Sequence, residues 1–449
     1  MTRSFRVRPG PARDQSIILN TGRRDLCLDR SRQARLSFGT ASTAVTVGTS
    51  KKIAPDEILI SPKAIKALHL PTWPHFELSV KAGELALGPL VGILAATSGD
   101  SLRKRGLRAF NGYVQQYGRL HGAVVVFALD GVDRTRKTVR GHCYDPQQDA
   151  WKEGVFPYPL AIYRRVRLDP GWRGHFASVI GDRVFNSRFP DKWEACRWLT
   201  AENAVGDLVP DTVLHRETDD VFSMLDKYRS VYVKPIRGLQ GRGIFQVSLV
   251  GQPVVRFREA GQNKQESFAS REELGSFLGR RLAPGRYIIQ QQVDLARHQG
   301  RVVDFRVIVQ KDESRDWKCY AIVARVAAQG SIVSNLSSGG SAVPGELLLT
   351  RGLGMSQEDA YVQLERIRMV AHRVGKVLDR FMNAGTTGLD VGLDTLGRLW
   401  LLEVNLRDPS PQVAQSASDP LAYYALMSEI MFYGKALAGF GPEESCHVL

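Results

Sequence analysis

Short runs of alternating apolar and polar residues occupy the first 88 residues of the chain. Side chains that alternate in this way face opposite sides of a strand, so each run predicts a half-buried β-strand. One stretch after Ser61 has the spacing of a short helix instead. We therefore expect residues 1–88 to form a small β-rich N-terminal domain. The runs are SIILN (16–20), AVTVG (44–48), ILISP (58–62), FELSV (76–80) and ELALG (84–88).

The pattern changes at residue 90, where strands become continuously apolar. LVGILAAT (90–97) and AVVVFAL (123–129) have no polar face, and the segment 101–120 between them has helical spacing. Strands buried on both faces and joined through a helix are typical of a parallel α/β unit. We expect an α/β domain over residues 89–185.

From residue 186 onward, apolar strands alternate with helices up to the end of the chain. One long helix is predicted over 356–382. A strand-rich segment around 222–292 has its own helix and is expected to form a separate lobe. The whole chain thus reads as an α/β protein with α+β lobes, in which residues 186–449 form the third domain.

Charge and cysteine usage limit the class of protein. The 61 Lys and Arg residues exceed the 46 Asp and Glu residues by 15. This excess is dispersed, without the aromatic and basic clustering of single-strand binders, so it favours an anionic small molecule or an acidic partner over nucleic acid. The five cysteines show no C-x-x-C spacing, which predicts reduced thiols and no zinc site. No signal peptide or membrane span is evident, and we expect a cytoplasmic protein with no membrane partner.

Three oxygen-bearing side chains near the C-terminus form the most informative motif. In LDVGLDTLGRLWLLEVN, Asp390 lies on one strand, and Glu403 and Asn405 lie two residues apart on the next. Residues at i and i+2 of a strand face the same way, and the turn at residues 396–397 allows antiparallel pairing with Asp390. Such a set suits Mg²⁺, which is completed by water and nucleotide phosphates. The alternative is an ordinary surface hairpin.

A lysine followed by glycines suggests a phosphate-binding turn. In VKPIRGLQGRGI, Lys234 ends a strand, and Gly238, Gly241 and Gly243 precede the next strand. Glycines let backbone N–H groups approach phosphate oxygens, and lysine adds a charge. A tight turn without ligand remains the alternative, because neither the P-loop nor the dinucleotide-binding spacing is present.

Further polar positions lie inside apolar strands or beside them. YIIQQQVDL ends in a polar segment whose backbone suits the edge of an adenine, or it is a plain buried strand. Arg306 and Arg325 are flanked by apolar residues, and a buried guanidinium needs either an ion pair, for instance with Asp304, or a bound anion. We favour the anion. The loop SNLSSGG (334–340) offers Asn335 to a substrate or phosphate, or is simply flexible.

Taken in order, these motifs resemble the ATP-grasp superfamily of ATP-dependent carboxylate–amine ligases. The likeness spans about residues 186–409, and its most specific element is D-x12-E-x-N. DFRVIVQ, Arg325 and SNLSSGG resemble the branch that contains ribosomal-protein glutamate ligases. LALGPLVGILAAT, FNSRFPDKW, YIIQQQVDL and SNLSSGG are similar to the YheC/YheD family of endospore coat-associated proteins. The resemblance implies an ATP-grasp fold preceded by a pre-ATP-grasp α/β domain.

The resemblance also implies a role for each residue. Helix-borne Lys192 and strand-borne Lys234 would hold the α- and β-phosphates of ATP, and the glycine turn would close over the γ-phosphate. The Gln291 carbonyl and Val293 N–H would meet the adenine, and Asp294 the ribose. Many family members have a glutamate in this hinge where Gln290–Gln292 stand here; backbone recognition should preserve ATP binding. Arg306 and Arg325 would neutralise the phosphoryl group, and Asp390, Glu403 and Asn405 would bind Mg²⁺.

The function implied by this resemblance is ADP-forming ligation of a carboxylate to an amine through an acyl phosphate. An amino acid joined to a peptide or protein fits, and the basic excess suggests that one substrate is acidic. The alternative is a spore-coat-associated structural protein that keeps an ATP-binding module.

Overall fold

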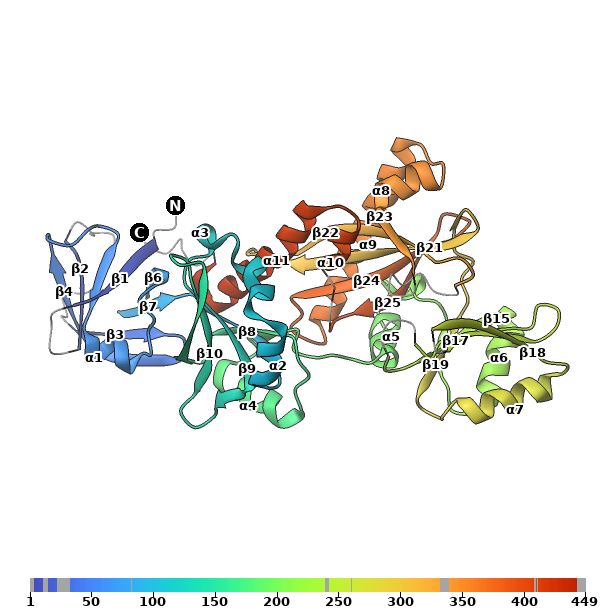
Figure 1. Cartoon of the computed structure of the whole chain (residues 1–449), viewed down its shortest axis with the longest axis horizontal. Coiled ribbons are helices and arrows are strands. Elements are labelled where there is room, and N and C mark those ends of the chain that lie inside the picture. The colour runs from blue at the N-terminus through green and yellow to red at the C-terminus, as the bar shows by residue number, and fades with distance from the viewer. Residues whose placement is uncertain are drawn as a thin grey trace. The chain divides into compact units, whose positions relative to one another are not determined.

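The computed structural model describes residues 4–10, 15–21, 33–81, 83–238, 242–259, 261–331, 339–407, 409 and 411–441. The chain separates into two compact units (Figure 1). Unit 1 contains Met1–Ser187, Lys311–Asp316 and Tyr424–Leu449, and unit 2 contains Arg188–Gln310 and Trp317–Tyr423.

Unit 1 begins with a closed β-barrel in the order β1-β5-β2-β4-β3-β7-β6. The alternation of apolar and polar residues in the sequence determines which side chains face the interior of the barrel and which face its outside. In β2, for example, Ile17 and Leu19 are buried and their neighbours are not. The short helix α1 (Pro62–Ala67) starts at Ser61, whose hydroxyl accepts from the Ala64 N–H. The strands are β1 (Ser4–Pro9), β2 (Ser16–Asn20), β3 (Gln33–Phe38), β4 (Ala41–Ser50), β5 (Glu57–Ile60), β6 (His75–Lys81) and β7 (Glu84–Gly88).

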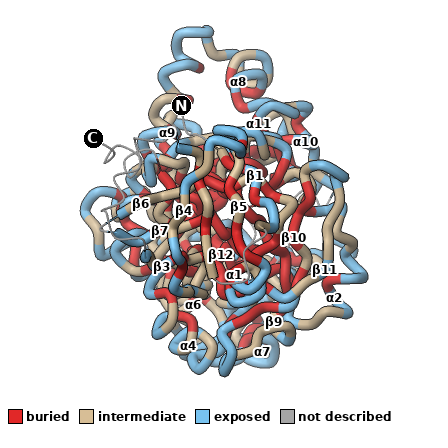
Figure 2. The backbone as a smooth tube through the Cα atoms, turned by 90° about the vertical axis from the view of Figure 1, so that its left-hand side faces the viewer, coloured by how far each residue is buried: buried red, intermediate tan, exposed pale blue. Residues whose placement is uncertain are grey.

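The second part of unit 1 is a six-stranded sheet in the order β11-β10-β9-β8-β12-β13. Strand β8 is buried along its whole length and runs parallel to β9 and β12, as predicted, whereas β10 pairs antiparallel with β9 and β11. Buried stretches of backbone follow the strands, whereas the loops are mostly exposed or intermediate (Figure 2). The strands are β8 (Leu90–Ala96), β9 (Ala123–Asp133), β10 (Thr138–Asp145), β11 (Ala150–Pro157), β12 (Ala161–Arg164) and β13 (Val184–Phe185), and α4 is Pro170–Ile180.

The single helix predicted over 101–120 is wrong. The segment folds as α2 (Gly99–Arg105), the 3₁₀ helix η1 (Leu107–Val114) and α3 (Tyr117–Leu120). Helix α2 ends at Gly106, which adopts φ 76°, a conformation that glycine reaches without steric cost. The helical periodicity was present in the sequence, but the glycine determined where the helix stops.

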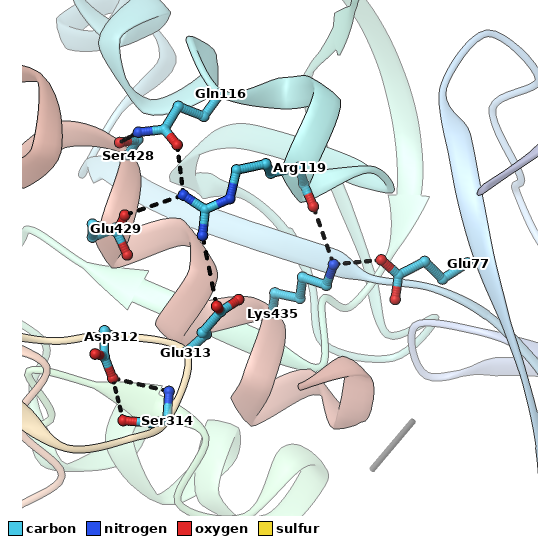
Figure 3. A network of polar contacts seen from close by, with 9 residues as sticks. All are labelled: Glu77, Gln116, Arg119, Asp312, Glu313, Ser314, Ser428, Glu429 and Lys435. Carbon is cyan, nitrogen blue, oxygen red and sulfur yellow. Dashed lines mark hydrogen bonds and ion pairs between the residues drawn. The ribbon is translucent and has the colours of Figure 1, made fainter. Parts of the chain in front are cut away.

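A network of ion pairs and hydrogen bonds connects helix α11 (Pro420–Lys435) with other elements of unit 1 (Figure 3). The Lys435 ammonium forms a buried ion pair with Glu77 and donates to the Arg119 carbonyl at 3.2 Å. Arg119 in turn lies 3.6 Å from both Glu313 and Glu429. This network and the π-helix η5 (Ala436–Phe440) place the end of the described chain with the N-terminal strands. The three-domain division remains a prediction.

Unit 2 contains an antiparallel lobe in the order β14-β19-β15-β16-β17-β18. Helices α6 and α7 and the strands bury one shared core of side chains. The elements of the lobe are β14 (Thr212–Leu214), α6 (Thr218–Tyr228), β15 (Ser230–Pro235), β16 (Phe245–Ser248), β17 (Val254–Glu259), β18 (Gln262–Ser267), α7 (Arg271–Arg281) and β19 (Tyr287–Gln291). The preceding elements α5 (Lys192–Thr200) and η2 (Gly206–Leu208) contribute side chains to the core of the other sheet of unit 2.

The other sheet of unit 2 has the order β23-β22-β21-β24-β25, and β20 pairs with β21. The predicted long helix is confirmed as α9, and Ser356 caps it by accepting from the Asp359 N–H. Within the described residues, no helix has both the length and the apolar character needed to cross a membrane. The elements are β20 (Arg297–His298), β21 (Arg301–Lys311), β22 (Trp317–Val326), β23 (Ser341–Pro344), α8 (Gly345–Leu347), η4 (Leu348–Gly352), α9 (Gln357–Asp379), β24 (Thr386–Leu393), β25 (Leu399–Asn405) and α10 (Gln412–Ser416).

Candidate functional site

The β24–β25 hairpin brings the three predicted metal ligands to one face of its sheet. The two strands are antiparallel, with Asp390 opposite Glu403 and Gly388 opposite Asn405. Because alternate residues of a strand share a face, both pairs point to the same side. The expected hairpin geometry is therefore present.

The donor atoms on this hairpin fit Mg²⁺. Two carboxylates and an amide oxygen are hard ligands, and Mg²⁺ usually takes its other ligands from water and phosphate. No three His, Cys, Asp or Glu side chains gather as a metal site in the part of the chain that is described. The buried Asn405 Nδ2 has no hydrogen-bond partner among the described residues, and it offers a donor to a phosphate or water oxygen.

Two arginines and two aspartates form a largely buried row that includes Asp390 of the hairpin. Arg325 donates to both oxygens of Asp304 at 2.7 and 2.5 Å, and its Nη2 also lies 3.1 Å from Asp390 Oδ2. Arg306 Nε lies 2.9 Å from Asp390 Oδ1 as an ion pair without hydrogen-bond geometry. The sequence analysis favours a bound anion for these arginines, but for Arg325 the structure contains the alternative, the ion pair with Asp304.

Electrostatics within this row favour the charged forms. Burial alone would raise the pKa of Asp390, but Arg306 and Arg325 hold the pKa below its usual range. Burial likewise opposes the charge of Arg325, and Asp304 and Asp390 outweigh that effect and raise its pKa. The row is thus a set of fixed charges that compensate one another.

Arg306 also explains a glycine in the hairpin. A Cβ atom added at Gly388 would lie 2.9 Å from Arg306 Nη1. A side chain at position 388 would therefore displace the guanidinium from the face that bears Asp390. The sequence analysis did not single out Gly388, although it stands two residues before Asp390 on the same face.

Helix α5 places the predicted phosphate-binding lysine against the hairpin. Asp191 caps the helix by accepting from the Glu194 N–H, and Lys192 is the first helical residue. Its Nζ lies 2.8 Å from Glu403 Oε1 and 3.5 Å from the Gly238 carbonyl oxygen. A cation from the helix, a carboxylate from the hairpin and the start of the glycine turn therefore meet at one point.

Lys234 lines a pocket next to this meeting point. Its Nζ donates to Gln290 Oε1 at 2.5 Å. Burial lowers the pKa of Lys234, whereas the charge of Glu403 acts in the opposite direction. The cavity volume of this pocket is about 30 Å³. It is lined by Lys192, Ala195, Cys196, Leu199, Val209, Lys234, Ile288, Gln290, Leu401, Leu402, Glu403 and Val404.

The two lysines at this pocket suit the phosphates of a nucleotide, whereas a cavity of about 30 Å³ is too small to hold a base. Gln290 was not predicted as a site residue. It was overlooked among three consecutive glutamines, although strand alternation puts it on the same face as Ile288 and opposite to Gln291. This alternation is the signal that could have found it.

The predicted hinge residues lie beside this lining rather than in it. Among the described residues that line the pocket, Gln291, Val293 and Asp294 do not occur. The Gln291 N–H donates to the Asp211 carbonyl at 2.8 Å, and Asp294 is exposed. Their adenine and ribose contacts remain predictions.

The glycine turn and the polar loop are described only in part. Gly243 adopts φ 71°, which favours glycine, and Gly238 is exposed beside Lys192. Gly241 and Asn335 lie outside the described residues. Their roles therefore remain predictions.

Comparison with known proteins gives consistent matches. The family described as "YheC/D like ATP-grasp" matches residues 181–437. The chain is 26% identical over 396 residues to the endospore coat-associated protein YheD of Bacillus subtilis (strain 168), covering 83% of each sequence. It is 21% identical over 276 residues to YheC of the same organism, covering 60% of this chain and 75% of YheC. Among solved structures, the VanG D-Ala:D-Ser ligase from Enterococcus faecalis is 12% identical with a TM-score of 0.43, covering 78% of this chain and 98% of that one.

Proposed function

The chain belongs to the YheC/D-like ATP-grasp family, and on this basis we propose that it is an ATP- and Mg²⁺-dependent ligase that joins a carboxylate to an amine. The observation that best supports this proposal is the 2.8 Å contact of Lys192 with Glu403 beside the pocket that Lys234 lines. Cations for phosphates and carboxylates for a metal are both needed where ATP is cleaved. We propose an amino acid and a peptide or protein as the substrates, one of them acidic.

The chemistry explains why a site of this kind needs only charges and donors. A substrate carboxylate oxygen attacks the γ-phosphorus, the bond to ADP breaks, and an acyl phosphate forms. The amine nitrogen then attacks the acyl carbon, phosphate leaves with the bonding electrons, and the nitrogen loses a proton. Both steps build negative charge on oxygen, which fixed cations stabilise most in the transition state. Mg²⁺, when bound, would neutralise phosphate oxygens in both steps.

The proposed residue roles follow from the contacts. Lys192 would leave Glu403 for a phosphate oxygen when the hairpin receives the metal. Arg306, which has a single carboxylate partner in the described contacts, would face the transferred phosphoryl group from above Gly388. Arg325 would act on the same side, and its contacts support a further role in holding Asp390 in place.

An assay of ADP release over pooled amino acids and acidic peptides tests this proposal. The purified chain is incubated with ATP and Mg²⁺, and each pool is added in turn. We expect ADP release to rise only when a pool supplies both a carboxylate and an amine acceptor. Stimulation by no pool would contradict the ligase and favour the second candidate.

The second candidate is a structural protein of the spore coat that keeps a nucleotide-binding module. The names of the two relatives, both described as endospore coat-associated, favour it. This candidate predicts ATP binding without substrate-dependent turnover, together with location in the spore coat. Fractionation of spores with an antibody to the chain, combined with the ADP assay, separates the two candidates.

Lys234→Met should weaken nucleotide binding while the chain still folds. One charge-assisted hydrogen bond to phosphate contributes about 1.5–3 kcal/mol, and methionine keeps the length of the side chain. Isothermal titration with AMPPNP and Mg²⁺ measures the loss. Lys264→Met serves as the control, since Lys264 is an exposed lysine of the same lobe that pairs with Glu259. Equal affinities of the two variants would mean that Lys234 is not a phosphate ligand.

A further inference from the structure

Three neighbouring strands of the lobe carry a series of hydrogen-bonded polar groups that ends at Lys234. Thr212 on β14 lies directly opposite Gln290 on β19, and Lys234 on β15 lies opposite Ile288 of the same strand. Lys234 and Gln290 are thus diagonal neighbours on one face, a separation that long side chains can span. Gln290 is only 5% exposed, so its amide is shielded from water.

The donor and acceptor of each hydrogen bond in this series are fixed. Thr212 Oγ1 lies 2.7 Å from the Pro210 carbonyl oxygen, which can only accept, so the hydroxyl proton is committed there. Thr212 Oγ1 can then only accept from Gln290, whose Nε2 lies 3.1 Å away. The other end of the same amide must present its oxygen, and Oε1 lies 2.5 Å from Lys234 Nζ. The Pro210 carbonyl therefore determines how the amide of Gln290 is turned.

The hydrogen-bond partner of Lys234 is a neutral amide, and this distinguishes Lys234 from Lys192. Lys192 contacts a carboxylate, Glu403, whereas the described contacts of the Lys234 ammonium include an amide oxygen and no carboxylate within ion-pair distance. An amide fixes the position of the ammonium without neutralising it. The positive charge of Lys234 is thus held in place and available to an anion.

We propose that Thr212 and Gln290 are positioning residues, which act through Lys234 to present its ammonium to a phosphate oxygen of the nucleotide. The proposal rests on the proposed function, since it assumes that a nucleotide phosphate reaches Lys234. It adds two residues whose role is to orient the lysine that contacts the nucleotide. It also gives a reason for an amide, rather than a carboxylate, at position 290.

Thr212→Val and Thr212→Ser test the positioning role as a matched pair. Valine keeps the shape of threonine but removes the hydroxyl, and serine keeps the hydroxyl. We expect Thr212→Val to weaken AMPPNP·Mg²⁺ binding about three- to tenfold, the effect of one lost buried hydrogen bond, and Thr212→Ser to retain wild-type affinity. Isothermal titration measures both, and circular dichroism confirms that both fold.

Thr212→Val and Thr212→Ser, introduced into the Lys234→Met variant, show whether Thr212 acts through Lys234 or through the stability of the lobe. A residue that acts through Lys234 loses its effect once the ammonium is gone, so Thr212→Val should change nothing there. An equal loss in both backgrounds, or no loss in the wild type, would overturn the positioning role. If Lys234→Met itself left AMPPNP binding unchanged, the proposed nucleotide site would fail instead.

Gln290→Glu provides a second test if the threonine variants do not fold. The carboxylate keeps the shape of the amide but neutralises the ammonium and repels phosphate. We expect affinity for AMPPNP·Mg²⁺ to fall about tenfold or more. Unchanged affinity would overturn the proposal, because it would show that the charge of Lys234 need not be kept available.

Discussion

Glu403→Gln should abolish Mg²⁺-dependent ATP turnover and leave the fold intact. A neutral amide cannot balance a divalent ion that is shared with phosphate, and losses on the order of 10²–10³-fold are typical when one stabilising group of a charged transition state is removed. The cost to stability should be small, about 1 kcal/mol or less, because the Lys192–Glu403 pair is partly exposed. ADP release measured across a range of Mg²⁺ concentrations gives the result.

Binding of ADP without metal distinguishes a lost metal ligand from a damaged pocket. Glu403→Gln frees Lys192 from its carboxylate, so affinity for metal-free ADP should persist or increase. Glu365→Gln serves as the control, since Glu365 pairs with Arg368 on an exposed face of α9. Wild-type turnover in Glu403→Gln would remove this hairpin from the proposed site.

The geometry of the β24–β25 hairpin could be predicted from sequence because it depends on neighbouring residues alone. Asp390, Glu403 and Asn405 fall on two strands joined by a short turn, and the two-residue period of a strand alone decides which side chains share a face. The structure pairs Asp390 with Glu403 as this reasoning requires. Short-range periodicity was enough here, since no distant segment is needed to form the hairpin.

The partners of these residues could not be predicted, because they are distant in the sequence. Lys192 and Glu403 are separated by 211 positions, and Lys435 and Glu77 by 358. Neither contact can be recognised from the spacing of neighbouring residues in the sequence. Only the packing of whole elements brings such charges together, and a single sequence contains no direct record of that packing.

Two errors of detail have local causes that the sequence did contain. Gly106 interrupts the predicted helix because it adopts a positive φ, and glycine is the residue that most often ends a helix in this way. Gln290 was overlooked because three glutamines look alike in composition. Their faces differ, however, and only the register of β19 against β14 and β15 identifies the one that contacts Lys234.

Arg325→Met should destabilise unit 2 strongly and eliminate turnover with it. The substitution leaves Asp304 buried without its bidentate partner and removes one of the two cations beside Asp390. Removing one partner of a buried ion pair typically costs about 3–5 kcal/mol, because the remaining charge is no longer compensated. Thermal and urea denaturation followed by tryptophan fluorescence measure the loss. Arg306→Met should cost less, since Arg306 contributes a single contact to Asp390 and is less deeply buried.

The double variant Asp304→Asn/Arg325→Met, compared with Asp304→Asn and Arg325→Met alone, shows whether the loss comes from uncompensated charge. It removes one anion and one cation together, and Arg306 still compensates Asp390, so part of the lost stability should return. A double variant as unstable as the sum of the single variants would mean that Asp304 and Arg325 do not compensate each other. If stability returns while turnover stays lost, the arginine has a role in the reaction in addition to its role in the fold. That outcome would support its place beside the phosphoryl group.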